Sequence, residues 1–343
     1  MLNKWYTKYE LATRLALFYT ASALSGAFSG LLAYAIAKMD GVGGQEGWRW
    51  IFLLEGIATV LMGAITPFVL TDTPDRRPKW LTDEECDYLT RRMVAQNGGE
   101  RANKEGQKLT LALLKDIVTD WQYYPMVLIY WSNTVPNYGM KFTLPTIIKN
   151  MGFSSSNAQL LSIPPYVAGA ISSVGFSILS DKMRRRSYFL MIPQVIVVIS
   201  YCIITPLSPR IKDYIGACFF AVILSNIGVY PINPGTSSWA SNNSAGVAKR
   251  SVALAFILSL GNVGGIFASY IFIDSEAPGY PTGFGVSMAA AFAGIIAVVF
   301  LDIYYKRINK KRDKMSIEEI SETYSQGDLA KLGNHSPLFR YTR

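Results

Sequence analysis

Long apolar runs separated by short charged segments set the pattern of this sequence. Five stretches contain no Asp, Glu, Lys or Arg, namely 15–37, 187–209, 214–248, 251–273 and 277–301. A helix crosses a bilayer with about 20 apolar residues. Helices in soluble cores rarely run that long without a charge. The pattern therefore predicts an all-α integral membrane protein. Its expected spans are 13–37, 50–70, 124–147, 159–180, 187–206, 213–232, 251–273 and 285–305.

The loops between these spans differ in their basic content. If the first residues face the cytoplasm, the inside segments carry 24 Lys and Arg residues and the outside loops carry five. Cytoplasmic loops of membrane proteins are enriched in Lys and Arg. The sequence therefore predicts a multi-pass protein with both termini cytoplasmic. The first fourteen residues are too polar for the apolar region of a signal peptide.

The distribution of charge divides the chain into four segments. Two spans occupy 1–70, a polar central loop occupies 71–123, six spans occupy 124–305, and a tail occupies 306–343. The central loop is long and charged, which is typical of a linker between two groups of helices. We expect it to lie in the cytoplasm, as we expect for the tail.

Two polar segments have patterns of their own. In the central loop, Thr82 is followed three residues later by Glu85, the arrangement of a helix capping box. The tail begins with KRINKKRDK at 306–314, a basic cluster suited to anionic lipid headgroups at the inner leaflet. The rest of the tail is polar and is expected to lack fixed structure.

Composition excludes several classes of function. Only 17% of the residues are charged, against about a quarter in soluble domains. The formal net charge is +9, but the basic residues fall between apolar spans, so no nucleic-acid partner is expected. Three cysteines form no disulfide framework and no metal spacing. The only histidine, His335, lies in the tail, which argues against a histidine-based catalytic or metal site. No cofactor is expected.

The turn SDKMRRRS at 180–187, between the fourth and fifth spans, resembles a loop motif of the major facilitator superfamily. That motif joins a small residue, an Asp and a basic cluster between the second and third helices of each half. The matching positions here are Gly175, Asp181, Arg184 and Arg185. Met183 stands where the motif usually has Gly. The resemblance implies a gating role for the turn, and we expect Asp181 to bind a neighbouring helix end through a charge-assisted hydrogen bond.

Other blocks are similar to one fungal branch of that superfamily, the anion:cation symporter or allantoate permease-like family. They are GWRWIFLLEGI at 47–57, FTLPTIIKNMGFS at 142–154, AQLLSIPPYV at 158–167, SWASNNSAGVAKRS at 238–251 and PGYPTG at 278–283. The resemblance implies two six-helix halves joined by a long cytoplasmic loop. It also implies secondary transport of small organic anions, such as vitamins, allantoate or other carboxylates, usually driven by protons, and a place in the plasma membrane.

The resemblance also implies a shortened first half. If 124–305 is the complete second half, the two spans of 1–70 correspond to the last two helices of the first half. About four N-terminal helices are then expected to be missing. The expected fold is therefore that of the major facilitator superfamily with about eight transmembrane helices, a truncated first half and a complete second half.

Polar residues within the spans are the candidates for a substrate site, because intramembrane polar groups are costly and mark function. Tyr130, Asn133, Asn137 and Lys141 share one face of the third span. A phenol, two carboxamides and an ammonium suit a small carboxylate. Lys141 lies near the outer end of its span, so its ammonium could instead reach the membrane interface.

The sixth and seventh spans supply further polar candidates. These are Asn226, Tyr230, Asn233 and Asn262. Pro231 and Pro234 are expected to break the sixth helix. The amides could line the cavity, or they could only bridge helices, because polar side chains hold membrane helices together.

Glu55, in the second span, has two interpretations. It could relay a proton, or it could pair structurally with a basic residue or with backbone groups, and its surrounding block favours the structural role. Glycines four residues apart, Gly26 with Gly30 and Gly261 with Gly265, indicate close helix packing.

These patterns favour a secondary transporter of a small organic anion, coupled to protons and working by alternating access between two helix bundles. The competing hypothesis is a non-transporting membrane protein, either a truncated remnant or a regulatory partner of a full-length carrier. An incomplete first half would leave polar cavity groups against lipid. The sequence contains neither a phosphate-binding loop nor a nucleophile with a histidine partner, so no enzyme is expected.

Overall fold

Long helices run side by side through most of the molecule. The computed structural model of the chain describes residues 2, 5–96, 110–325, 329 and 332–343, and within them no residue lies in a β-strand. Seven helical stretches in this described part are long and apolar enough to cross a membrane. They are Leu11–Leu32, Gly47–Val69, Asn157–Met183, Ser187–Arg210, Ile215–Asn242, Val247–Ile271 and Pro281–Arg312.

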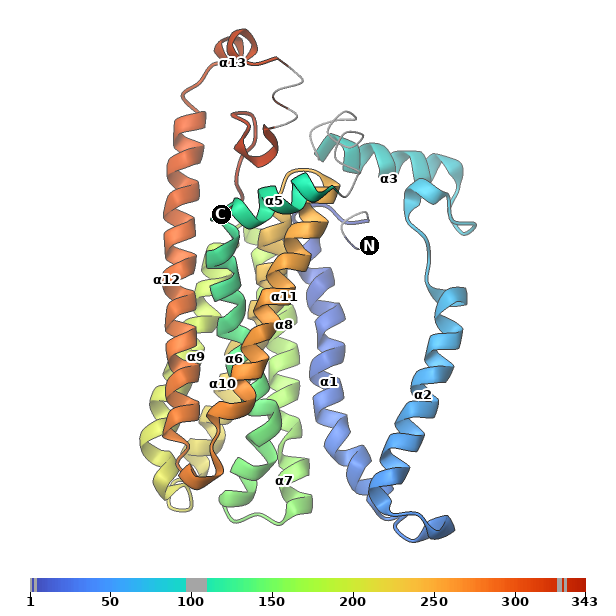
Figure 1. Cartoon of the computed structure of the whole chain (residues 1–343), viewed down its shortest axis with the longest axis vertical. Helices are drawn as coiled ribbons and strands as arrows, with labels where there is room; N and C mark the ends of the chain where they lie inside the picture. Colours follow the sequence, from blue (N-terminus) through green and yellow to red (C-terminus); the bar gives the residue numbers. More distant parts are fainter. Residues whose placement is uncertain (1, 3–4, 97–109, 326–328, 330–331) are drawn as a thin grey trace.

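The helices are named in chain order in Figure 1. The long ones are α1 (Leu11–Ala37), α2 (Gly47–Val69), α6 (Tyr123–Asn150), α8 (Ile163–Met183), α9 (Ser187–Leu207), α10 (Ile215–Asn242), α11 (Val247–Ile271) and α12 (Pro281–Arg312). The shorter ones are α3 (Asp83–Gln96), α5 (Leu111–Thr119), α7 (Ser155–Leu161) and α13 (Ile317–Thr323). Single 3₁₀ turns lie at Val42–Gly44, Pro74–Arg76, Ser208–Arg210, Asp274–Glu276 and Gly333–His335.

The prediction of about eight spans is therefore only partly supported. All eight predicted stretches are helical, but α6 is not among the seven that qualify by length and hydropathy. Polar residues along its 28-residue length lower its apolar character. The predicted span 159–180 begins in α7 and continues in α8, with Ser162 between the two helices.

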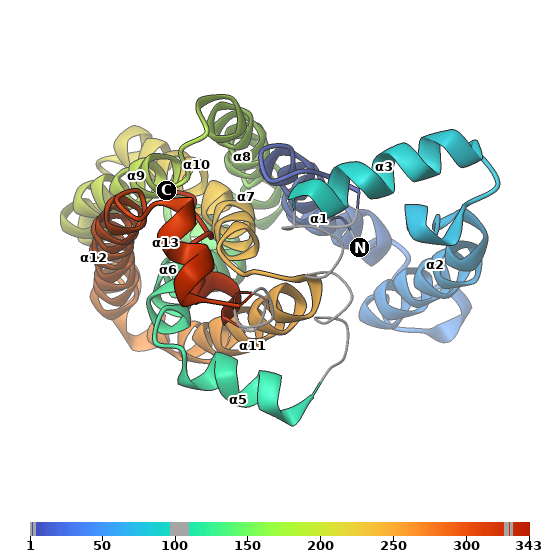
Figure 2. The same ribbon diagram turned by 90° about the horizontal axis from the view of Figure 1, so that it is seen from above.

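Six long helices, α6 and α8 to α12, form one bundle, and α1 packs beside it against α8 and α10 (Figure 1, Figure 2). We call one end of this bundle the basic end, because the Lys- and Arg-rich segments that the sequence assigns to the cytoplasmic side lie there. There α1, α6, α9 and α11 begin, α8, α10 and α12 end, and α5 lies across the helices (Figure 1).

Helix α2 stands away from the bundle and packs only lightly against α1 (Figure 2). Its apolar side chains are exposed around the whole circumference, and Phe68 is 90% exposed. In water such a surface would be unstable, but lipid is as apolar as these side chains. This helix therefore suits an environment of lipid or of further apolar helices.

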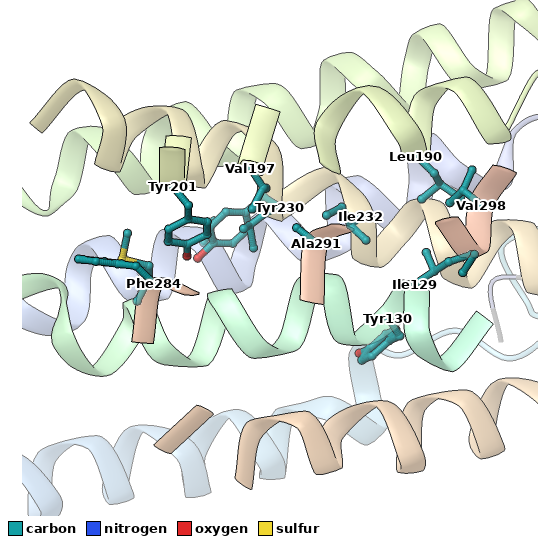
Figure 3. Close-up of a cluster of buried hydrophobic side chains, with 14 of the residues drawn as sticks. Ile129, Tyr130, Leu190, Val197, Tyr201, Tyr230, Ile232, Phe284, Ala291 and Val298 are labelled. Carbon is teal, nitrogen blue, oxygen red and sulfur yellow. The ribbon is translucent and has the colours of Figure 1, made fainter. Parts of the chain in front are cut away.

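The core lies between α6, α9, α10 and α12. Figure 3 shows the layer in which Leu190 and Val197 of α9 face Ile232 of α10 and Ala291 and Val298 of α12. These side chains are almost completely buried. The layer holds the second group of helices together as one unit.

The expectation that Pro231 and Pro234 break the sixth span is wrong, since α10 continues through both to Asn242. A proline in a helix leaves the carbonyl four residues earlier without its usual N–H donor. Here the carbonyl of Ile227 instead accepts a hydrogen bond of 2.8 Å from the Ser172 hydroxyl of α8. A neighbouring helix thus satisfies the free carbonyl, which is how membrane helices tolerate proline.

Of the two expectations for the polar segments, the one for the central loop is confirmed and the one for the tail is wrong. The capping box is confirmed: the Thr82 amide donates to Glu85 Oε2 (3.0 Å) and the Glu85 amide donates to Thr82 Oγ1 (3.3 Å) at the start of α3. The described part of the tail, in contrast, does not lack structure, while residues 326–328 and 330–331 lie outside the described residues. Residues 333–343 pack onto the basic end, and Tyr341 and Thr342 are buried there.

Candidate functional site

A cavity of about 280 Å³ opens between α1, α6, α10 and α11. Apart from Leu258, its lining side chains are polar or carry a phenol. They are Tyr19, Ser22, Tyr130, Asn133, Thr134, Asn137, Tyr138, Lys141, Tyr230, Asn233, Leu258 and Asn262. This volume and this lining fit a small polar molecule.

Lys141 supplies the positive charge of the cavity. It stands on α6, and its Nζ donates a hydrogen bond of 3.3 Å to the Ser22 hydroxyl of α1. The ammonium therefore points across the cavity toward α1 rather than out to the membrane interface. Among the lining residues that the structure describes, no carboxylate neutralises it. The cavity therefore has a net positive charge.

Phenols and carboxamides pair around this charge. The Asn233 amide of α10 donates to the Tyr130 hydroxyl of α6 at 3.0 Å. The Tyr138 hydroxyl of α6 donates to Asn262 Oδ1 of α11 at 3.4 Å. These bonds run between helices, so the same groups that line the cavity also fix the positions of its walls.

Asn133 is held deeper in the wall and is only 1% exposed. Its Nδ2 donates to the Val229 carbonyl of α10 at 2.7 Å, which fixes the orientation of the amide. Its Oδ1 has no hydrogen-bond partner among the described residues. A buried acceptor without a partner is costly, so this oxygen is suited to a donor from water or substrate.

Two glycines allow α11 to approach α6 at the cavity wall. A Cβ at Gly261 would lie 2.2 Å from the Tyr130 ring, and one at Gly265 would lie 3.0 Å from the Tyr138 ring. Small residues allow such close contact between membrane helices. The expected packing role of this glycine pair is confirmed, and it places two cavity tyrosines.

Most of the sequence candidates meet at this cavity. Those that line it are Tyr130, Asn133, Asn137, Lys141, Tyr230, Asn233 and Asn262. Asn226 lies elsewhere: it is buried, and its Nδ2 donates to the Val222 carbonyl of its own helix at 3.0 Å. Glu55 also lies elsewhere, exposed on α2. The helical periodicity of the sequence identified the cavity-facing candidates on α6. A helix face alone does not show which neighbouring helices lie opposite it.

Sequence reasoning missed several cavity residues. They are Tyr19, Ser22, Thr134, Tyr138 and Leu258. Tyr19 and Ser22 lie on α1, whose apolar and small residues gave no polar face to notice. Tyr138 neighbours Asn137 in the sequence but was not included in the predicted face. Among the described residues, no cluster of His, Cys, Asp or Glu could hold a metal ion.

A second polar site lies at the basic end, where Asp181 joins α8 to the first turn of α1. Asp181 Oδ2 accepts from the Thr13 amide at 2.9 Å and from the Thr13 hydroxyl at 2.6 Å. The expected hydrogen bond from this loop to a neighbouring helix end is thus confirmed. It connects the first group of helices to the second.

The arginine that accompanies Asp181 is Arg186, which the sequence candidates did not include. Arg186 is 1% exposed, and its guanidinium forms a salt bridge of 2.6 Å with Asp181. Arg184 and Arg185 are more exposed and lie over the rings of Tyr9 and Tyr188. Three adjacent arginines look alike in a sequence, and only the fold shows which one turns inward.

Comparison with known proteins decides the family. A family model described as the Major Facilitator Superfamily matches residues 1–269. The chain belongs to this superfamily. Members of the superfamily are multi-pass membrane transporters of small molecules and not enzymes, which agrees with the apolar helices and the polar cavity.

Fungal members of the superfamily align along almost the whole chain. The MFS-type transporter cnsO of Penicillium expansum is 35% identical over 99% of this chain and 67% of its own length. An uncharacterized transporter of Schizosaccharomyces pombe is 31% identical over 91% of this chain and 60% of its own length. The high-affinity nicotinic acid transporter of Saccharomyces cerevisiae is 26% identical over 99% of this chain and 61% of its own length. The chain thus spans 60–67% of the length of these relatives.

A solved structure confirms the fold. The proton:xylose symporter XylE, bound to 6-bromo-6-deoxy-D-glucose, superposes with a TM-score of 0.60 at 16% identity. The match covers 88% of this chain and 65% of XylE. At this level of identity the similarity concerns the helix arrangement alone.

Proposed function

We propose that the protein is a secondary transporter of a small organic anion, such as a vitamin, allantoate or another carboxylate. The observation that carries this proposal is the cavity with Lys141 as its charged group and no carboxylate among its described lining residues. An ammonium surrounded by neutral phenols and carboxamides favours a single negative charge with polar substituents. The similarity to a nicotinic acid transporter supports it, since nicotinic acid is a small carboxylic acid.

We propose protons as the coupling ion on electrical grounds. Moving one negative charge into a cell that is negative inside costs about 2.3 kcal/mol per 100 mV of membrane potential. A proton carried with each anion cancels this cost. Glu55 is exposed on α2, outside the cavity, so a proton-relay role for it has no support from its position.

In the proposed mechanism, the segment 1–70 and the helices of 124–305 move relative to each other around the cavity. The central loop 71–123 connects them. The bond between Asp181 and Thr13 holds them together at the basic end, and we propose that it breaks when this end opens. Arg184, Arg185 and Arg186 keep the turn basic, with Arg186 orienting Asp181. We place the basic end in the cytoplasm, with both termini, and the protein in the plasma membrane.

A non-transporting role, as a remnant or as a regulatory partner of a full-length carrier, is the second candidate. One observation favours it: the apolar surface of α2 is exposed around its circumference among the described residues. Such a helix presents an interface on which another membrane protein could pack.

Uptake measurements separate the two functions. The full chain is produced in a yeast strain that lacks its own carriers, and membrane insertion is verified by fractionation. Uptake of labelled nicotinate, biotin, pantothenate or allantoate that rises at acidic external pH, and that Lys141→Gln strongly reduces, supports the proposal. Inserted protein that takes up none of them overturns the organic-anion proposal for those compounds.

A further inference from the structure

Residues 333–343, which we call the strap, lie across the basic end of the bundle, away from the cavity. Thr342 anchors the strap to α10. Its amide donates to Asn243 Oδ1 at 2.7 Å, and its carbonyl accepts from Trp239 Nε1 at 2.8 Å and from Asn243 Nδ2 at 3.1 Å. Every backbone polar group of Thr342 is thus used, in a buried position.

Tyr341 anchors the strap to α12. Its amide donates to Asn309 Oδ1 at 3.0 Å and its carbonyl accepts from Asn309 Nδ2 at 2.8 Å. Its ring stacks on Tyr305, with the centroids 4.4 Å apart. The two anchors together bind the strap to two helices of the second group, in a defined register.

The strap also meets the contact between the two groups of helices. The Arg186 amide donates to the Arg343 carbonyl, while the Arg186 guanidinium donates to the Lys8 carbonyl at 2.6 Å. The Lys8 ammonium lies 5.3 Å from the centre of the Phe339 ring. Lys8 lies three residues before Leu11, the first residue of α1, so the strap reinforces the same junction that Asp181 and Thr13 form.

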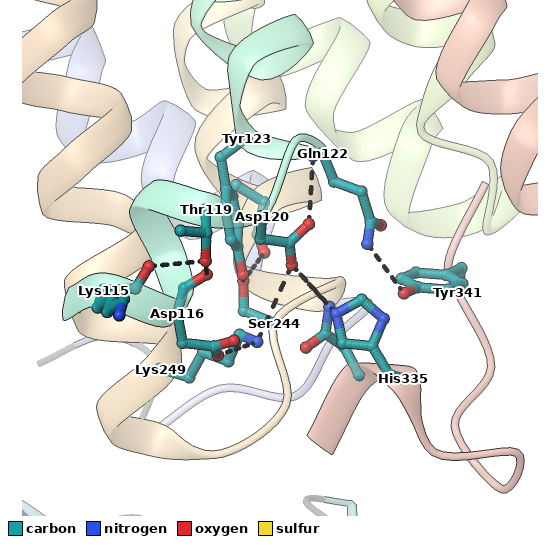
Figure 4. Close-up of polar contacts among 12 residues, drawn as sticks. Lys115, Asp116, Thr119, Asp120, Gln122, Tyr123, Ser244, Lys249, His335 and Tyr341 are labelled. Atoms are coloured by element: carbon teal, nitrogen blue, oxygen red, sulfur yellow. Dashed lines mark hydrogen bonds and ion pairs between the residues drawn. The ribbon is translucent and has the colours of Figure 1, made fainter. Parts of the chain in front are cut away.

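The other end of the strap rests on a buried carboxylate (Figure 4). Asp120 has a side chain only 3% exposed, and its Oδ2 lies 3.4 Å from His335 Nε2 and 4.0 Å from Lys249 Nζ. Asn334 Nδ2 donates to the same oxygen at 3.4 Å. Burial alone would raise the pKa of Asp120, but the bond from His335, the Gln122 amide and the charge of Lys249 hold it below its ordinary value.

We propose that the strap is a latch that keeps the basic end closed, and that protonation of His335 tightens it. This inference rests on the proposed transport function, because a latch matters only if the basic end opens. Imidazole is the side chain whose charge ordinarily changes between pH 5 and 8. His335 is 47% exposed, so it exchanges protons with the surrounding solution.

The groups around His335 do not change charge in this range. The charged and titratable groups near Asp120 are Lys249 of α11, Tyr123 of α6, and Tyr304 and Tyr305 of α12. Around them, Asp116 of α5 pairs with Lys249, Arg312 of α12 binds the Asn334 carbonyl, and Tyr341 of the strap binds Gln122. Carboxylates, lysine, arginine and tyrosine ordinarily titrate well below or well above neutral pH. Protonated His335 forms an ion pair with Asp120, so strap attachment is strongest at mildly acidic pH, where the imidazole is protonated and Asp120 is still charged, and it weakens as the pH rises.

The latch has a consequence for proton-coupled uptake. Each cycle of the proposed transporter delivers a proton to the cytoplasm, where we place the strap. An acidic cytoplasm would then tighten the strap and slow opening of the basic end. The device would limit acid loading by the carrier itself.

Hydrogen exchange of the full chain in lipid nanodiscs tests the latch without requiring transport. The amides of Tyr341 and Thr342 report the strap, and the Thr13 amide reports the junction with Asp181. After correction for intrinsic exchange, protection of all three should rise about two- to fivefold from pH 7.5 to 5.5, as expected for a partly exposed ion pair. His335→Gln should remove this rise.

Two further variants make the result decisive. Asp120→Asn should also remove the rise, because the protonated imidazole loses its anion. Glu322→Gln, a charge change at an exposed tail position, should leave it intact. A rise that persists in His335→Gln overturns the role of His335. Protection of Thr13 that does not follow the strap overturns the latch, whereas a failed uptake assay with normal exchange behaviour overturns only the transport proposal.

Discussion

Lys141 shows how much depends on the direction of one side chain. At the residue scale its charge is useful only because its Nζ turns toward Ser22 across the cavity. The same lysine directed to the interface would be an ordinary anchor, an alternative that the sequence left open. The geometry makes it the first residue to test.

Replacing Lys141 by Gln should reduce organic-anion uptake by about tenfold to a hundredfold, the range for losing a charged hydrogen-bond partner. The measurement is the initial uptake rate at several substrate concentrations in membranes with equal protein. Lys149→Gln is the matched control, because Lys149 lies on the same helix but is exposed. Equal losses in both variants would contradict a specific role for Lys141.

Ser172 is important for a different reason, since its hydroxyl replaces the donor that Pro231 lacks. Ser172→Ala should destabilise the protein by about 0.6 kcal/mol, the average for polar contacts between membrane helices. Thermal or denaturant unfolding in detergent measures it. Ser251→Ala is the control, because that exposed hydroxyl bonds only within its own helix. A Ser172→Ala variant as stable as this control would show that the carbonyl of Ile227 finds another donor.

At the scale of elements, the contact between α6 and α11 connects packing to function. The glycine face of α11 lets the tyrosines of α6 sit between the helices, and those tyrosines also line the cavity. A change in spacing between the two helices therefore changes both stability and the shape of the site.

Gly261→Ala should cost about 1–3 kcal/mol of stability, because its Cβ would overlap the Tyr130 ring and overpacked cores lose energy in this range. Uptake should fall with it, since Tyr130 would be displaced. Gly285→Ala on α12 is the control: its Cβ meets nothing within 4 Å. Melting temperature and uptake rate are measured on both variants, and a stable, active Gly261→Ala protein would refute the packing account.

The elements also show what sequence reasoning can reach. The hydrophobic runs in the sequence predicted the position of every long helix. A bilayer requires about 20 mainly apolar residues for each span, and such a run can be recognised without knowledge of the rest of the fold. The continuation of α10 through two prolines was not visible, because the compensating hydroxyl lies on α8, far away in the sequence. Likewise, the predicted face of α6 gave four of the twelve residues that line the cavity, while the part from α1 depended on tertiary packing.

At the scale of the whole molecule, Asp120 joins parts of the chain that are distant in sequence. It lies between α5 and α6 and is near Lys249 of α11 and His335 of the strap. The sequence could not predict this site, because His335 stood alone in a polar tail. The strap 333–343 has fixed structure because it packs on the bundle, a contact that its polar sequence does not show.

Because the pKa of Asp120 is lowered in the folded protein, its charge stabilises the fold above the pKa of an unfolded aspartate. That contribution should be lost as the pH falls through the lowered value, below about pH 4. The free energy of unfolding, measured in detergent between pH 6 and 3, should therefore fall less with decreasing pH in Asp120→Asn than in the natural protein. The same pH dependence in both proteins would contradict this role of the carboxylate.

Trp239 gives the molecule an optical reporter of its own. The indole is fully buried, packs edge-on against Tyr305 and donates its N–H to the strap carbonyl of Thr342. Detachment of the strap would admit water to this indole and shift its fluorescence to longer wavelength. The difference spectrum between the natural protein and Trp239→Phe isolates that signal from the other tryptophans, so opening of this end can be followed in real time without an attached dye.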